Sequence, residues 1–187
     1  MLLTAAFAAL TLGAATFDNP FEDLGPEIGS AIPHNLDLVD QTGNTRDLKD
    51  LTGEQGLILM FNRSLDWCPF CVAQTLAINE VRADFEEIGF NIAVLTYDPV
   101  DELTMFAKER DIEITLLSDP DSVAIDAFGL RNEDYASNPR VYGVPHPVVF
   151  VVSPTGEIEG KLYEESYRDR PANEAVLELT NAAVAAR

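Results

Sequence analysis

The chain has 187 residues, of which 32 are acidic and 12 are basic, so its formal net charge at pH 7 is −20. This charge argues against binding to nucleic acids or to anionic membrane surfaces, because both would repel the protein. The apolar share of 47% suffices for a sizeable core, and two cysteines are too few for a small disulfide-stabilised scaffold. The length fits one domain with a short terminal extension.

The N-terminal segment, residues 1–17, carries no charged side chain. Its apolar run from Leu2 to Leu12 is too short to span a bilayer and is followed by small residues, which predicts a cleaved secretory signal. The first basic residue is Arg46, whereas a signal usually starts with Lys or Arg, so an apolar N-terminal helix stays open. With a signal the protein would be periplasmic or secreted and have no membrane span after cleavage. Without one it would be cytoplasmic.

The rest of the chain alternates between strand and helix patterns. Residues 18–35 are rich in Asp, Glu, Gly and Pro and predict an extended lead-in. After it we expect, in order, a hairpin whose first strand is 36–39 and whose turn is 41–44, a buried strand over 56–61, a helix from 69 to 88, a strand over 91–96, a helix from 99 to 110, a strand over 114–117, a short helix over 120–128, an irregular stretch over 131–143, two antiparallel strands over 148–162 and a helix over 171–185.

Two helices share one predicted start. Asp98 and Asp119 each precede a proline, which indicates an N-cap followed by a proline at the first helical position. In the second helix Val123, Ala127 and Phe128 are expected to face the core.

This element order predicts an α/β fold. Alternating strands and helices imply a crossover-connected sheet with helices on both faces, and the hairpins make that sheet mixed. We expect one domain over residues 36–187.

The two cysteines lie where a strand-to-helix loop ends. Cys68 follows the loop, and Pro69 fits the first helical position, where a missing N–H does no harm. Free N–H groups and the helix dipole would then lower the pKa of the Cys68 thiol. Cys71, one turn later, should be more buried and able to close a disulfide. The sequence therefore predicts that Cys68 attacks and Cys71 resolves.

Metal binding is the alternative use of the pair. Two thiolates are half of a tetrahedral zinc site, and neither His34 nor His146 has ligand spacing to the cysteines. We expect no cofactor and no resident metal. A non-catalytic or metal-binding interaction module stays as the alternative of another class.

Longer motifs carry a family resemblance. The stretch Trp67–Cys71 resembles the active-site motif of the thioredoxin superfamily. The stretches 61–71, 116–121, 127–129 and 147–158 are similar to redoxins of the alkyl hydroperoxide reductase/thiol-specific antioxidant family. The similarity covers about residues 30–165 and implies a thioredoxin-like fold.

The resemblance also assigns residues around the sulfurs. It implies a cis-proline at Pro147, opposite the active-site helix, for which Pro145 is the rival candidate. His146 precedes Pro147, and it is either a protonated imidazole beside the thiolate or a solvated loop histidine. Together with Trp67, Pro69 and Phe70, His146 and Pro147 form the expected substrate-binding set.

Two departures from the family pattern bear on activity. Typical peroxidases of the family place Pro, Thr and Arg where this chain has Phe61, Leu65 and Pro147. Arg63 could supply a cation, although an Arg on a loop is more often at the surface.

The second departure is from thioredoxin. Its buried Asp is replaced by Asn62, which cannot take a proton. Asp66 and His146 are candidate substitutes.

The leading functional interpretation is a thiol–disulfide oxidoreductase that exchanges with a protein dithiol, a protein disulfide or an electron donor. The alternative is a peroxiredoxin-like thiol peroxidase acting on hydroperoxides.

Overall fold

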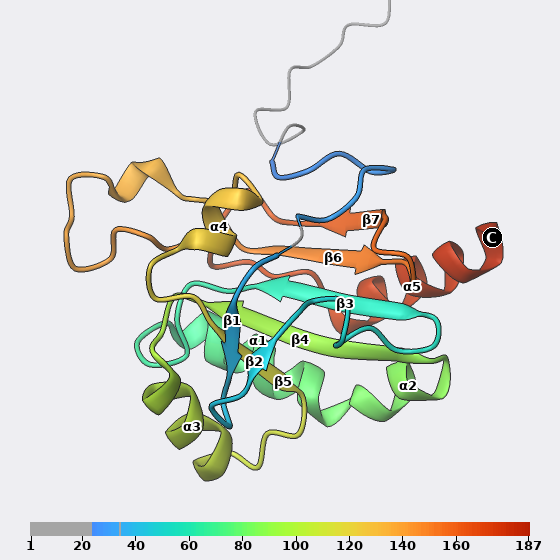
Figure 1. The fold of residues 1–187 in the computed structure, drawn as a ribbon, viewed down its shortest axis with the longest axis horizontal. Coiled ribbons are helices and arrows are strands. Elements are labelled where there is room, and N and C mark those ends of the chain that lie inside the picture. The colour runs from blue at the N-terminus through green and yellow to red at the C-terminus, as the bar shows by residue number, and fades with distance from the viewer. Residues whose placement is uncertain (1–23, 34) are drawn as a thin grey trace, which may run out of the picture.

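The sheet is mixed, as predicted (Figure 1). A computed structural model describes residues 24–33 and 35–187, so the predicted signal, His34 and part of the lead-in lie outside the described residues. The strand order is β2-β1-β5-β4-β3-β6-β7; β3, β4 and β5 are parallel neighbours and the other pairs are antiparallel. The strands are β1 (Leu38–Asp40), β2 (Thr45–Arg46), β3 (Gly56–Phe61), β4 (Phe90–Thr96), β5 (Thr115–Ser118), β6 (Val148–Val152) and β7 (Ile158–Leu162).

Two hydrophobic clusters cover the two faces of this sheet. Side chains of β3 alternate between them: Leu57, Leu59 and Phe61 pack into one cluster, and Ile58 and Met60 into the other. The first cluster includes α4 (Val123–Ala127), and the second includes α1 (Pro69–Glu80), α2 (Arg82–Glu87), α3 (Val100–Glu109) and α5 (Asn173–Ala186). Helices therefore lie on both faces, as expected. None of the described helices is long and apolar enough to cross a membrane.

The predicted helix over 69–88 is divided in two. Val81 leaves the helical conformation, with φ −102° and ψ 11°, so α1 ends at Glu80 and α2 starts at Arg82. The side-chain carbonyl of Asn79 accepts the backbone N–H groups of Glu113 and Ile114. This contact ties the end of α1 to the start of β5.

The Asp98–Pro99 cap prediction is wrong. Helix α3 begins only at Val100, and Pro99 is its N-cap. The Asp98 carboxylate is buried and does not cap α3. It accepts the backbone N–H of Leu65 at 2.6 Å and the hydroxyl of Thr96 at 3.0 Å. It therefore anchors the loop that leads to the cysteines.

The Asp119–Pro120 prediction is wrong in the same way. Helix α4 begins at Val123, after Ser122 in the left-handed conformation. The Asp119 carboxylate still serves this helix from outside, because it accepts the backbone N–H groups of Val123 and Ile125.

The later start also changes which face of α4 is buried. Val123 and Ala127 are exposed, contrary to expectation, whereas Phe128 is buried as predicted. Ala124 and Ile125 take the predicted inward positions.

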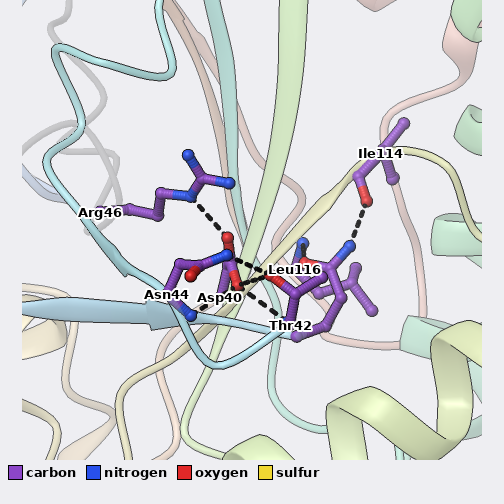
Figure 2. Close-up of polar contacts among 7 residues, drawn as sticks. Asp40, Thr42, Asn44, Arg46, Ile114 and Leu116 are labelled. Carbon is purple, nitrogen blue, oxygen red and sulfur yellow. Dashed lines mark hydrogen bonds and ion pairs between the residues drawn. The ribbon is translucent and has the colours of Figure 1, made fainter.

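The predicted N-terminal hairpin is present as β1 and β2, and one carboxylate closes it (Figure 2). Asp40 accepts the backbone N–H and the hydroxyl of Thr42, the backbone N–H of Asn44 and the guanidinium of Arg46. Burial acts to raise the pKa of Asp40, but these hydrogen bonds outweigh it and lower the pKa to about 2. The turn thus depends on an ionised carboxylate.

The side chain of Gln41 joins this hairpin to the sheet. Its amide donates to the Ile114 carbonyl at 3.0 Å and accepts the backbone N–H of Leu116 at 2.9 Å.

The connection between α4 and β6 is the longest described loop. It contains a 3-10 turn over Glu133–Tyr135 and projects past the ends of β3 and β4 (Figure 1). The last helix, α5, begins at Asn173, two residues after the predicted start at Pro171.

Candidate functional site

The two cysteines form a disulfide at the start of α1. Their Cα atoms are 5.3 Å apart. Cys68 is the N-cap of α1, Pro69 occupies the first helical position, and the backbone N–H of Cys71 points at the Cys68 sulfur at 3.4 Å. The predicted placement of the sulfur at a helix N-terminus is confirmed. That position stabilises a thiolate when the pair is reduced.

Both sulfurs are buried in this disulfide form, and aromatic rings form the rim around them. Trp67 and Phe70 are each 37% exposed. The Trp67 indole N–H donates to the hydroxyl of Tyr97 at 2.9 Å, and the Phe70 ring meets the Tyr167 ring edge-on at 6.2 Å. The predicted position of Trp67 and Phe70 beside the pair is thus an exposed aromatic rim.

Arg63 is buried beside this rim rather than at the surface. Its side chain is only 5% exposed. The guanidinium carbon lies 5.0 Å from the Trp67 ring centroid, 4.9 Å from that of Tyr135 and 4.2 Å from that of Tyr167. These rings come from the loop before Cys68, the loop after α4 and the loop after β7. Cation–π attraction to the Arg63 guanidinium therefore holds these three loops together.

Arg170 is the site residue that the sequence analysis missed. One of its guanidinium nitrogens lies 3.3 Å from the Cys71 sulfur, and the other terminal nitrogen donates to the backbone carbonyls of Tyr167 and Asp169. Burial, together with the positive charge of Arg63, lowers the pKa of Arg170 to about 10, so it stays protonated at neutral pH.

The sequence holds no local signal for this contact. Arg170 lies 99 residues after Cys71 and directly follows the charged residues Arg168 and Asp169, a pattern typical of a solvated loop.

His146 and Pro147 differ from expectation. The peptide bond before Pro147 is trans, so the cis-proline prediction is wrong. The chain entering β6 is already extended: Pro145 bridges Arg131, and the His146 backbone N–H donates to the Leu130 carbonyl at 2.7 Å. Pro147 does border the active-site region, because it lines a narrow cavity together with Arg170.

The surroundings of the His146 imidazole disfavour its charged form. It is half-buried, and burial lowers its pKa, which disfavours the imidazolium. No hydrogen bond joins it to either cysteine.

No described carboxylate replaces the proton acceptor that Asn62 lacks. Asn62 is buried and donates its amide to the Thr75 hydroxyl at 3.3 Å. Asp66 is exposed, and Asp98 is occupied by Leu65; burial raises the pKa of Asp98. The charged group with a described contact to a sulfur is therefore the guanidinium of Arg170.

The described residues contain no group of three or more His, Cys, Asp or Glu side chains that could hold a metal ion. His34, one of the two histidines weighed as zinc ligands, lies outside the described residues.

Comparison with known proteins gives one consistent result. Residues 28–161 match the sequence model of the AhpC/TSA family. The chain is 24% identical over 136 residues to peroxiredoxin Bcp of Escherichia coli K12, which covers 73% of this chain and 85% of that protein. A putative peroxiredoxin Bcp of Haemophilus influenzae is 26% identical over 121 residues, 65% of this chain and 76% of the relative.

Solved structures share the fold. Peroxidoxin BcpB from Mycobacterium tuberculosis superposes with a TM-score of 0.69 at 21% identity, covering 86% of this chain and 97% of that one. AhpC of Enterococcus faecalis gives a TM-score of 0.71 at 20% identity, with 85% and 93% covered. With the mixed sheet and the cysteine pair at the start of α1, these matches establish that the chain belongs to the AhpC/TSA family of thioredoxin-like redoxins, as an oxidoreductase.

Proposed function

We propose that the protein is a thiol–disulfide oxidoreductase that cycles between a Cys68–Cys71 dithiol and the disulfide. The observation that carries this proposal is the placement of Cys68 as the N-cap of α1 with Cys71 bonded to it one turn later. A dithiol at this position holds one sulfur as an activated nucleophile and the other within reach for resolution.

The cycle has two thiol-exchange steps. The Cys68 thiolate attacks one sulfur of a partner disulfide, which forms a mixed disulfide and releases one partner thiolate. The Cys71 thiolate then attacks the Cys68 sulfur, forms the Cys68–Cys71 disulfide and releases the second partner thiolate. The partner is reduced by two electrons, and a dithiol donor returns the pair to its reduced state. Trp67, Pro69 and Phe70 form the rim that the partner contacts, and His146 and Pro147 border it.

Hydroperoxide reduction is the second candidate, supported by the relatives named peroxiredoxins and by the guanidiniums of Arg63 and Arg170. The Cys68 thiolate attacks the terminal peroxide oxygen, the O–O bond breaks, and the alkoxide leaves as an alcohol after taking a proton. The resulting sulfenic acid then loses water when Cys71 attacks it. Guanidinium groups can stabilise the developing oxyanion. The Thr and Arg of typical family peroxidases are still absent at Leu65 and Pro147.

Two assays on the same protein separate these candidates. Disulfide exchange predicts that the protein accelerates insulin reduction by dithiothreitol, measured by turbidity, and that Cys68→Ser removes the acceleration. An equal rate with the wild-type protein and the variant would refute it.

Peroxidase activity predicts a fast change in the fluorescence of Trp67, the one tryptophan of the chain, when reduced protein meets a hydroperoxide in a stopped-flow instrument. A rate close to that of free cysteine would exclude it.

We further propose that residues 1–17 are a secretory signal and that a redoxin domain over residues 36–187 follows the lead-in. The support is the uncharged apolar run at the start of the sequence. The intact mass of protein expressed in its native host tests it. A cleaved product places the protein outside the cytoplasm, and an uncleaved chain contradicts the proposal.

A further inference from the structure

We propose that Arg170 is a positioning residue that holds Cys71 as a thiolate in the reduced protein, so that resolution needs no proton acceptor. The proposal rests on the exchange role assigned to Cys71 above. It assigns to the loop after β7, which lies beyond the family-matched residues 28–161, the task of activating the resolving sulfur.

The contact itself is direct and held in place. The guanidinium nitrogen of Arg170 lies 3.3 Å from the Cys71 sulfur, and the backbone carbonyls of Tyr167 and Asp169 fix the other terminal nitrogen. The guanidinium therefore does not have to move or lose side-chain freedom when the disulfide opens. A positive charge within about 4–6 Å of an acid typically lowers its pKa by about 1–3 units.

The two arginines of this region are held without an ion pair in the described part of the chain. Neither Arg63 nor Arg170 forms an ion pair among the described residues. The buried Nε atoms of both arginines also have no hydrogen-bond partner there. Buried charges and donors are normally paired. In the disulfide state the sulfurs are neutral, so reduction to a thiolate would supply the missing negative charge.

Among the groups around Cys71, the guanidinium of Arg170 is the one that can stabilise a Cys71 thiolate. Arg170 is the cation in contact with Cys71, and Arg63 and Asp169 act on Arg170 as neighbouring charges. Glu164 lines the cavity that Arg170 and Pro147 share. Both of these carboxylates are exposed. Asn62 cannot accept a proton, and the described structure holds no carboxylate or imidazole hydrogen-bonded to either sulfur. A cation that stabilises the thiolate thus replaces a base that removes the proton.

The chain permits a measurement on one thiol alone, because it has only two cysteines. In the Cys68→Ser variant, thiolate absorbance at 240 nm followed against pH gives the pKa of Cys71 with no partner and no peroxide present. We expect Cys68→Ser/Arg170→Met to raise that pKa by at least about one unit, a tenfold loss of thiolate at a pH below both values. Cys68→Ser/Arg170→Lys should recover part of the shift.

Arg168→Met in the same background is the matched control. Arg168 is an exposed arginine of the same loop and has no described contact with a sulfur, so its removal should leave the pKa of Cys71 unchanged. Equal values for the Arg168→Met and Arg170→Met variants would overturn the proposal. That outcome would leave the exchange activity, which the insulin assay measures separately, untouched.

A second measurement keeps the proposal testable if the methionine variant does not fold. In the intact Cys68–Cys71 pair, Arg170→Gln should make the reduction potential more negative, because the reduced form loses its stabilising charge. A tenfold change in the equilibrium corresponds to about 30 mV for this two-electron couple. An unchanged or less negative potential in a folded Arg170→Gln variant would refute the proposal.

Discussion

The buried Asp98 carboxylate makes the sharpest test of how the cysteine loop is held. It accepts the Leu65 backbone N–H at 2.6 Å, three residues before Cys68, and the Thr96 hydroxyl at 3.0 Å. Asp98→Ala removes both acceptors and leaves a buried N–H without a partner, which costs about 1–3 kcal/mol for that group alone. With the lost side-chain packing, we expect unfolding free energy to fall by about 2–4 kcal/mol.

Asp98→Asn is the matched variant that separates hydrogen bonding from charge. The amide oxygen still accepts the Leu65 N–H, and no charge has to be buried, so we expect a change within about 1 kcal/mol. Burial raises the pKa of Asp98, and a carboxyl whose folded pKa is raised loses its stabilising contribution as the pH rises from the unfolded pKa through the folded one. The wild-type protein should therefore lose stability over that range relative to Asp98→Asn.

Urea unfolding of the oxidised proteins, followed by the fluorescence of Trp67, measures both effects. The indole is bonded to Tyr97, the residue before Asp98, so the probe reports on the same loop. Equal destabilisation by Ala and by Asn would show that the charge of the carboxylate, and not its hydrogen-bond acceptor, holds the loop, which would contradict the assigned role.

Three further predictions concern other parts of the fold. Asp40→Asn should lower the free energy of unfolding by about 1 kcal/mol at neutral pH, after allowance for solvent screening. Because the folded pKa of Asp40 is lowered from 3.8 to about 2, its stabilising contribution is complete above pH 3.8 and is lost as the pH falls through about 2. Acid-unfolding curves of the variant and the wild-type protein should therefore converge at low pH. Arg63→Met should weaken the attachment of the loops that carry Tyr135 and Tyr167, seen as faster hydrogen exchange there; unchanged exchange would contradict the cation–π assignment. Phe61→Ala should cost about 3–5 kcal/mol in urea unfolding, because the ring is fully enclosed, and a loss below 1 kcal/mol would show that the core collapses around it.

Local patterns in the sequence were enough to predict most of the strands and helices, and to place the two cysteines at the start of a helix. The apolar run of β3, the hairpin of β1 and β2 and the proline after Cys68 each depend on neighbours in sequence, and each was predicted correctly. The family resemblance added the thioredoxin-like arrangement.

Three of the failures share one physical cause, which is a long-range contact that outweighs a local preference. The position of Asp98 before a proline favours an N-cap, but its carboxylate instead accepts the backbone N–H of Leu65. An arginine on a loop is expected at the surface, but the rings of Tyr135 and Tyr167, from two distant loops, cover Arg63. Arg170 reaches Cys71 across 99 residues of sequence, and no periodicity encodes such a contact.

The rings of Trp67, Tyr135 and Tyr167 around Arg63 bear on when the surroundings of the sulfurs can be completed. These rings come from segments that are far apart along the chain, and Tyr167 and Arg170 both follow the last strand of the sheet. During synthesis the two cysteines are made before Tyr167 and Arg170, and Arg170 follows Cys71 by 99 residues. The charged surroundings of the sulfurs therefore cannot be complete until residue 170 has been made, although both thiols are present long before.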